Sequence, residues 1–265
     1  MNMTTKKTVN AAMLVIGNEI LSGRTQDANI KHLGTELGLR GIQLSEVRIV
    51  ADIEQDIVDA INALRTRYDY VFTTGGIGPT HDDITSESIA NAFGVPNVPH
   101  PTGFKLLADF YASRDIEFNE ARQRMAHTPA GATLIKNEVS MAPGYCMENV
   151  YVMAGVPRIM RNMLEGILPL LKGGTVVKSH AFTTNLPEGV VAEHLKALEY
   201  SFDGKIDIGS YPKDRKGKVG YIVNLIIRSS DEEVLHSATK QLRNKLLALG
   251  GAVADGEVDE EELLA

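Results

Sequence analysis

Apolar runs alternate with amphipathic segments along the first two thirds of the chain. Residues 11–17 form a continuous apolar run that ends at a glycine, and residues 68–72 form a second run. Such runs are typical of parallel strands buried on both faces. Residues 42–50 alternate between apolar and polar side chains, as a less buried strand does, and residues 53–67 carry apolar residues at helical spacing. The pattern predicts an α/β fold with a mostly parallel sheet.

The middle of the chain continues with shorter predicted elements. Residues 94–101 contain three prolines and are unsuited to a central strand. We predict a helix over 103–114, capped by Thr102, and a second helix over 119–127. A hairpin over 142–153 and a helix over 158–171 follow.

The pattern changes at Lys172-Gly173-Gly174, which is the best candidate for a domain boundary. The predicted order beyond it is β-α-β-β-α-β, over residues 175–182, 187–200, 206–211, 219–228, 231–249 and 252–253. This order is that of a ferredoxin-like unit. We therefore expect a first domain over 10–172, a ferredoxin-like α+β domain over 174–254, and an acidic, mobile tail over 255–265.

Composition places the chain among soluble globular proteins. Its 265 residues are 43% apolar and 23% charged, which suits one or two domains. The net charge of −7 argues against a non-specific nucleic-acid binder, although a local basic pocket stays possible. The single cysteine, Cys146, excludes an intrachain disulfide and a cysteine-based zinc site. With one cysteine we expect a reducing, cytoplasmic compartment, and the apolar run over 11–17 is too short for a signal peptide or a membrane span, so we expect no membrane partner.

The segment from Thr73 to Thr85 carries the strongest chemical signal. It joins a predicted strand to a predicted helix and contains Gly75, Gly76 and Gly78. Glycine-rich turns allow backbone N–H groups to approach a phosphate closely, and the helix N-terminus adds about half a positive charge. The spacing is neither that of a Rossmann dinucleotide fingerprint nor that of a Walker loop. We predict a phosphate-binding turn of another kind.

Two adjacent carboxylates, Asp82 and Asp83, lie in this turn. Bare carboxylates repel a phosphate, so they indicate a divalent cation between the carboxylate and the phosphate. Asp52 occupies another strand-to-helix turn and could face the same pocket, because such turns share one edge of a parallel sheet. The alternative is that these aspartates only cap helices. His81 is either a general base or a solvent-facing loop histidine.

Further polar groups lie at equivalent positions along the chain. Glu19, Asp27 and Asn29 follow the first predicted strand, where ligand loops lie, although Asp27 could equally cap the next helix, over 28–39. A third strand–glycine turn–helix unit, over 154–157, could add backbone donors, with Pro157 well placed in the first helical turn. The remaining candidate phosphate contacts, for which surface charge is the alternative, are Arg122, Arg124 and His127.

Three motifs, over 17–29, 73–85 and 155–157, together resemble the N-terminal region of competence/damage-inducible protein A. That family is a branch of the molybdopterin-binding (molybdenum cofactor biosynthesis, MoaB/Mog-like) superfamily, and the N-terminal half of eukaryotic FAD synthase is similar. The resemblance covers residues 10–170 and continues more loosely through 208–212. It implies a three-layer α/β/α domain whose ligand lies at the glycine-rich turn.

The resemblance also implies chemistry. In the adenylyltransferase relatives, the aspartates matching Asp83 and Asp52 serve a metal-dependent adenylyl step. In the competence-protein and FAD-synthase relatives, the fold is associated with hydrolysis of dinucleotide pyrophosphates such as ADP-ribose or FAD. A divalent metal (Mg²⁺, or else Mn²⁺ or Co²⁺) supports that activity, in some cases with K⁺. We therefore expect Asp83 and Asp52 to be catalytic, and Asp83, Asp82 and Asp52 to hold the metal.

The expected substrate-binding residues lie within the three motifs, and they are Gly17, Asn18, Glu19, Asp27, Asn29, Thr74, Gly75, Gly76, Gly78, Thr80, Thr85, Gly155 and Pro157. The expected partner is a phosphorylated small molecule, either a dinucleotide or molybdopterin. The alternative to a pyrophosphohydrolase is a protein that binds a phosphorylated pterin without turnover, or one with an adenylyltransferase-like role in molybdenum cofactor biosynthesis.

The sequence also departs from the family pattern. The usual Pro-Gly-Val-Pro is Ala154-Gly155-Val156-Pro157 here, and Ile159 replaces a frequent glutamate. The nicotinamide-nucleotide deamidase domain of longer competence proteins does not follow the second unit, so we expect that activity to be absent. We expect a homo-oligomer, and one hypothesis is that the ferredoxin-like unit only mediates contacts between subunits.

Overall fold

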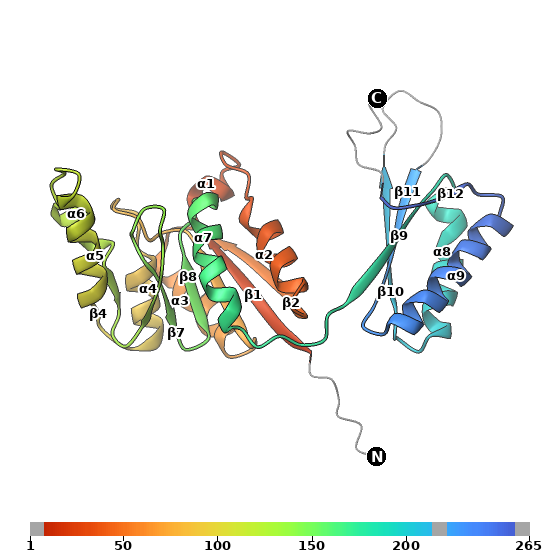
Figure 1. Cartoon of the computed structure of the whole chain (residues 1–265), viewed down its shortest axis with the longest axis horizontal. Coiled ribbons are helices and arrows are strands. Elements are labelled where there is room, and N and C mark those ends of the chain that lie inside the picture. Colours follow the sequence, from red (N-terminus) through yellow and green to blue (C-terminus); the bar gives the residue numbers. More distant parts are fainter. Residues whose placement is uncertain (1–7, 214–221, 258–265) are drawn as a thin grey trace, which may run out of the picture. The chain divides into compact units, whose positions relative to one another are not determined.

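The computed structural model describes residues 8–213 and 222–257, and its chain divides into two units after Thr175 (Figure 1). The described residues of the first unit form a six-stranded sheet in the order β2-β1-β3-β8-β7-β6. Its strands are β1 (Val9–Ile16), β2 (Ile42–Val50), β3 (Tyr70–Thr74), β6 (Thr133–Ile135), β7 (Gly144–Met147) and β8 (Val150–Met153).

Strand direction creates one functional edge in this sheet. β1 pairs in parallel with β2 and β3, and β3 pairs in parallel with β8. In the described part of this sheet, β7 alone runs against its neighbours, since it is antiparallel to both β8 and β6. The chain leaves β1 toward β2 on one side, and it leaves β3 toward β8 on the other. The carboxyl ends of β1 and β3 therefore flank a topological switch point, where open α/β sheets usually bind their ligands.

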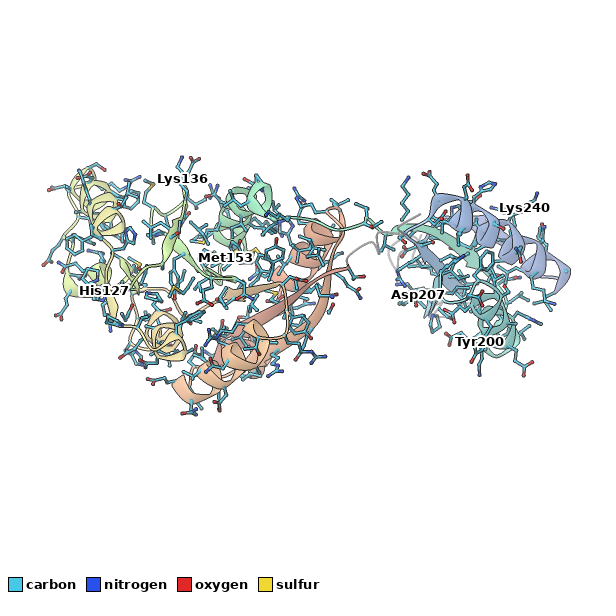
Figure 2. All side chains as sticks on the ribbon, turned by 90° about the horizontal axis from the view of Figure 1, so that it is seen from below. His127, Lys136, Met153, Tyr200, Asp207 and Lys240 are labelled. Carbon is cyan, nitrogen blue, oxygen red and sulfur yellow. The ribbon has the colours of Figure 1, made fainter. Side chains whose placement is uncertain are left out.

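Helices cover both faces of the sheet because alternate strand residues point in opposite directions. On one face, Met13 of β1 packs with buried residues of α2 and α7, and on the other Leu14 packs with α3 and α4. Met153, labelled in Figure 2, is fully buried in the first of these layers. This arrangement confirms the three-layer α/β/α fold. The helices are α1 (Asn18–Leu21), α2 (Asn29–Gly38), α3 (Glu54–Arg65), α4 (Thr85–Phe93) and α7 (Pro157–Ile167), followed by a short 3₁₀ turn, η1 (Leu168–Leu170).

A segment inserted between α4 and β6 forms its own small layer, at the left of Figure 1. Its elements are β4 (Asn97–Pro99), α5 (Pro101–Ala112), α6 (Glu120–Arg124) and β5 (His127–Pro129), with β4 and β5 paired antiparallel. Two predictions were wrong here. The cap of α5 is His100, not Thr102, because the His100 ring accepts the Gly103 N–H. The second helix ends at Arg124, because His127 already belongs to β5.

The second unit is a four-stranded antiparallel sheet in the order β10-β11-β9-β12, with α8 and α9 on one face (Figure 1). Phe182, Leu225 and Leu242 belong to its buried core. This is the expected ferredoxin-like arrangement. The elements are β9 (Lys178–Thr184), α8 (Glu188–Ser201), β10 (Asp207–Lys213), β11 (Ile222–Ser229), α9 (Glu232–Ala248) and β12 (Val253–Asp255).

The acidic segment that begins at Asp255 is described only in part. Asp255 ends β12 and forms an ion pair with Arg243 of α9, while residues 258–265 lie outside the described residues. Residues 219–221, at the start of the strand predicted over 219–228, also lie outside them. Among the helices that the structure describes, none has the length and apolar character that a bilayer crossing requires.

Candidate functional site

The turns after β1 and β3 meet through backbone atoms. Gly75 has φ +103°, and a Cβ there would lie 2.0 Å from the Ile16 carbonyl oxygen. Gly76 has φ +66°, and a Cβ there would lie 2.1 Å from Thr85 Oγ1. Glycine alone tolerates both the conformation and the approach. The predicted glycine-rich turn therefore lies at the switch point.

Hydrogen bonds fix the base of this turn. The Thr85 hydroxyl donates to the Gly75 carbonyl at 2.9 Å, and the Thr85 N–H donates to the Gly76 carbonyl at 3.0 Å. The Gly75 N–H donates to the Met153 carbonyl at 3.2 Å. Gly75 therefore cannot offer its N–H to a phosphate, contrary to the prediction for all three glycines. Among the described residues, the N–H groups of Gly76 and Gly78 donate no backbone hydrogen bond, so they remain available.

The turn after β8 joins the same place. A Cβ on Gly155 would lie 3.2 Å from the Gly75 Cα, and Asn29 Nδ2 donates to the Gly155 carbonyl at 2.8 Å. Asn29 is buried, and its Oδ1 has no hydrogen-bond partner among the described residues; the same holds for Thr74 Oγ1. Buried polar atoms without partners are rare and costly, so their presence beside the glycine turn favours a functional role for this edge.

Asp52 connects the turn after β2 to the turn after β1. Its Oδ2 accepts the Asn18 N–H at 2.9 Å, and the nearby Gly17 N–H donates to Val50 at 3.2 Å. The N-cap of α3 is Ile53, without a side-chain hydrogen bond. The capping alternative is therefore wrong for Asp52, whose carboxylate links two turns that are 34 residues apart in sequence.

Asp83 turns back onto its own loop. Its Oδ2 accepts the Thr80 N–H at 2.7 Å and the Thr80 hydroxyl, and a Cβ on Gly78 would lie 2.6 Å from this oxygen. The N-cap of α4 is Ile84, again without a side-chain bond, so neither aspartate caps α4. Asp82 is exposed, and Thr80 lowers the pKa of its carboxyl, which keeps it ionised.

The other predicted residues are less closely tied to the turn. Asp27 Oδ1 accepts the N–H groups of Asn29 at 2.9 Å and Ile30 at 2.7 Å, which satisfies the first turn of α2 as the capping alternative predicts, although the N-cap residue is Ala28. The Glu19 carboxylate is exposed and folds back toward Gly17. His81 and Pro157 are exposed, Pro157 as the first residue of α7.

A family model described as "probable molybdopterin binding domain" matches residues 12–173. The chain belongs to the molybdopterin-binding-domain family. A second family model, described as "FAD synthase, middle domain", matches residues 177–250. The site described above therefore lies wholly within the molybdopterin-binding domain, and the second unit resembles the part of FAD synthase that the second description names.

Relatives match most of the chain. A protein of Saccharolobus islandicus is 32% identical over 249 residues, covering 89% of this chain and 93% of its own. A protein of Aeropyrum pernix is 33% identical over 259 residues, covering 92% and 96%. The crystal structure of CinA from Thermoplasma acidophilum is 30% identical, with a TM-score of 0.56, and covers 61% of this chain and 97% of its own. The resemblance to competence/damage-inducible protein A is thus confirmed.

The predicted metal-binding carboxylates are Asp52, Asp82 and Asp83. Among the described residues, no three His, Cys, Asp or Glu side chains gather as a metal cluster. Asp52 and Asp83 each accept hydrogen bonds at Oδ2, and among the described residues the Oδ1 atom of neither accepts one. Mg²⁺ is typically bound by one or two carboxylates, with phosphate oxygens and water completing its shell. The described carboxylates alone therefore do not make up a metal centre, and a cation there would need ligands from a bound phosphate.

The inserted segment also reaches the glycine turn. Arg124 of α6 donates from one terminal nitrogen to the carbonyls of Pro79 at 3.0 Å and Thr80 at 3.4 Å. Arg122, in contrast, donates to the Glu117 carbonyl. Sequence reasoning treated Arg122, Arg124 and His127 alike, because nothing local distinguishes the arginine that faces the turn.

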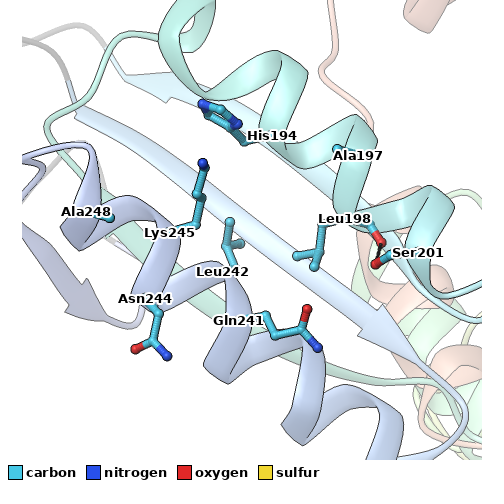
Figure 3. Close-up of a pocket in the computed structure, with 9 residues that line it drawn as sticks. All are labelled: His194, Ala197, Leu198, Ser201, Gln241, Leu242, Asn244, Lys245 and Ala248. Atoms are coloured by element: carbon cyan, nitrogen blue, oxygen red, sulfur yellow. Dashed lines mark hydrogen bonds between the residues drawn. The ribbon is translucent and has the colours of Figure 1, made fainter.

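A separate groove of about 570 Å³ lies between α8 and α9 of the second unit (Figure 3). His194 and Leu198 line it from α8, and Gln241, Leu242 and Lys245 line it from α9. None of the predicted site residues lies there.

Proposed function

We propose that the molybdopterin-binding domain binds a dinucleotide of the ADP-ribose or FAD class at the switch point between β1 and β3, and hydrolyses its pyrophosphate with a divalent cation. The observation that carries this proposal is the meeting of the turns after β1, β3 and β8 through glycine backbone, with Asp83 held by Thr80 beside them. The family descriptions, one of which names FAD synthase, support a phosphorylated ligand of this kind.

Backbone N–H groups would bind the phosphate, and a side-chain carboxylate would bind the cation. The N–H groups of Gly76 and Gly78, with the N-terminus of α4, would receive the phosphate oxygens. The Thr80 bonds orient the Asp83 carboxylate, so that its second oxygen can face the cation. When bound, the cation would neutralise charge on the phosphoryl oxygens and lower the pKa of an attacking water.

Asp52 would act mainly by positioning the turn after β1. β2 and β3 flank β1, so their ends lie about 10 Å apart at the usual strand spacing. A pyrophosphate with its cation spans such a distance more readily than one ion does. Asp52 holds the Asn18 N–H, and through it the turn that faces the glycines.

The test is hydrolysis of a dinucleotide panel, including ADP-ribose and FAD, by the purified protein with Mg²⁺, Mn²⁺ or Co²⁺. Asp83→Asn should lower kcat/KM by about 10²- to 10³-fold, as loss of transition-state charge stabilisation does. Asp59→Asn is the matched control, because Asp59 is an exposed carboxylate of α3 that accepts a hydrogen bond from Gln55. The proposal fails if no pyrophosphate is cleaved, or if Asp83→Asn and Asp59→Asn behave alike.

A second candidate function is binding of molybdopterin without turnover. The family description favours it, and the unpaired buried Asn29 and Thr74 oxygens could serve a pterin. Calorimetry with molybdopterin and with ADP-ribose separates the two candidates. Tight pterin binding without hydrolysis would favour the binding protein, whereas adenylylated pterin formed from ATP would favour an adenylyltransferase-like role.

A further inference from the structure

The tip of the glycine turn is exposed and is held from another element. Pro79, Thr80, His81 and Asp82 are all exposed. The carbonyls of Pro79 and Thr80 accept hydrogen bonds from Arg124, which lies 45 residues from Pro79 in sequence. An exposed loop of this kind normally samples several conformations, so a guanidinium that binds two successive carbonyls restricts it.

Arg124 is itself held in place by the inserted segment. Asn119 caps α6 by accepting the Arg122 N–H at 3.1 Å, and Gln123 donates to the Phe118 carbonyl at 2.8 Å. Phe118 stacks on Tyr111 of α5 with ring centroids 5.6 Å apart. Aromatic contacts of this kind stabilise the attachment of the short helix to α5. Arg124 therefore projects from a supported helix.

Thr80 connects Arg124 to the proposed metal-binding carboxylate. Its carbonyl accepts from Arg124 and from the Asp83 N–H, the latter at 3.3 Å, while its N–H and hydroxyl donate to Asp83 Oδ2. The backbone of Thr80 is thus bonded to the guanidinium through its C=O and to the Asp83 carboxylate through its N–H. A change in the position of Thr80 would move Asp83.

We infer that Arg124 is a positioning residue, which holds the glycine turn in its ligand-competent conformation and thereby presets Asp83. The consequence for ligand binding rests on the function proposed above. If only a fraction of the molecules has the competent turn, the apparent Kd rises by the reciprocal of that fraction. Once ligand is bound, the turn has the same conformation in every variant, so kcat changes little.

Two variants and one control test this inference in the full chain. Arg124→Gln removes the charge and the forked donors, and Arg124→Lys keeps a charged donor. Arg114→Gln is the control, because Arg114 is an exposed arginine of the same segment that stacks over Phe110. The measurements are KM and kcat for ADP-ribose with Mg²⁺, and hydrogen exchange of the Thr80 and Asp83 amides by NMR.

We expect Arg124→Gln to raise KM about tenfold with kcat within about twofold, and to lower the protection of both amides by a similar factor. Arg124→Lys should change KM and amide protection less than Arg124→Gln does, and Arg114→Gln should change neither KM nor amide protection. Unchanged amide exchange in Arg124→Gln would overturn the inference, as would equal effects of Arg124→Gln and Arg114→Gln.

Failure of the proposed function is distinguishable from failure of this inference. If the wild-type protein neither binds nor cleaves ADP-ribose, the proposed function fails, but amide exchange still shows whether Arg124 holds the turn. A fall in kcat without a rise in KM would contradict the positioning role, because it would indicate a direct part in the chemical step.

Discussion

Glycines with positive φ occur in both units, but the space around them, measured by what an added Cβ would meet, differs. Gly75 and Gly76 of the first unit would place a Cβ at 2.0 Å and 2.1 Å from other atoms of the chain. Gly204 and Gly250 of the second unit have φ +72° and +78°, yet a Cβ on either would meet nothing within 4 Å. Gly204 and Gly250 therefore serve backbone conformation alone, whereas Gly75 and Gly76 serve conformation together with close packing at the edge of the first unit.

This difference follows from strand direction. In the first unit the carboxyl ends of parallel strands share one edge, so the turns after them are pressed together. In the second unit every strand pair is antiparallel, and its turns lie at alternate ends. The comparison indicates that the tight contacts of Gly75 and Gly76 come from turns that converge at one edge of a parallel sheet.

The largest expected effect is that of Gly75→Ala. The new methyl group would need both a left-handed conformation and space that the Ile16 carbonyl occupies. We expect a loss of about 3 kcal/mol or more in the free energy of unfolding, and loss of ligand binding. Urea unfolding followed by circular dichroism measures the first quantity. A loss below 1 kcal/mol would contradict the packing argument.

Asp52 offers the next test, because two substitutions separate its hydrogen bond from its charge. Asp52→Asn can still accept the Asn18 N–H, whereas Asp52→Ala cannot. We expect the rate of dinucleotide hydrolysis to fall about tenfold in Asp52→Asn, which loses only the charge. It should fall about a hundredfold in Asp52→Ala, which loses the charge and also the hydrogen bond that positions the turn after β1. Equal rates in Asp52→Asn and wild type would limit Asp52 to a structural role.

Asn29→Ala should have an intermediate effect on stability. The substitution removes the 2.8 Å donor of the Gly155 carbonyl, and because Gly155 is exposed, the expected cost is that of one ordinary hydrogen bond, about 1 kcal/mol. Thermal unfolding measures the loss. Thr35→Ala is a suitable control in the same helix, because the Thr35 hydroxyl bonds to the exposed backbone of Lys31. Equal melting temperatures for the two variants would argue against coupling between α2 and the turn after β8.

Gly204→Ala sharpens the comparison from the other unit. Its left-handed conformation should cost about 1 to 2 kcal/mol, with no packing penalty added. Urea unfolding under the conditions used for Gly75→Ala allows a direct comparison. If Gly204→Ala were as damaging as Gly75→Ala, conformation alone would explain both glycines.

The smallest expected effect lies on β2, away from the glycine turn. The Tyr68 hydroxyl and Arg48 lower the pKa of Glu46 below its ordinary 4.5. A lowered folded-state pKa contributes stability above about pH 4.5, and this contribution is lost as the pH falls through the lowered value. Wild type should therefore exceed Glu46→Gln in stability at pH 7 by less than about 1 kcal/mol, and the difference should vanish in acid. A difference independent of pH would contradict the assignment.

Much of the site could be predicted because its signals are local. The strands, the glycine-rich turn and the carboxylates beside it occupy short stretches with a characteristic pattern. The roles of the aspartates could not be separated in this way. Asp27 bonds to N–H groups two and three residues away, as a cap does, whereas Asp52 bonds across 34 residues. Before folding, the two carboxylates have the same local appearance.

The sequence by itself determined the order of the longer strands and helices, the change of pattern near residue 173 and the place of the glycine turn, because periodicity and turn chemistry act over a few residues. Tertiary structure decided which groups stay available. Packing of β3 against β8 brings the Met153 carbonyl to the Gly75 N–H, and the inserted segment brings Arg124 to Thr80. Such contacts depend on how distant strands and helices pack, which no local pattern specifies.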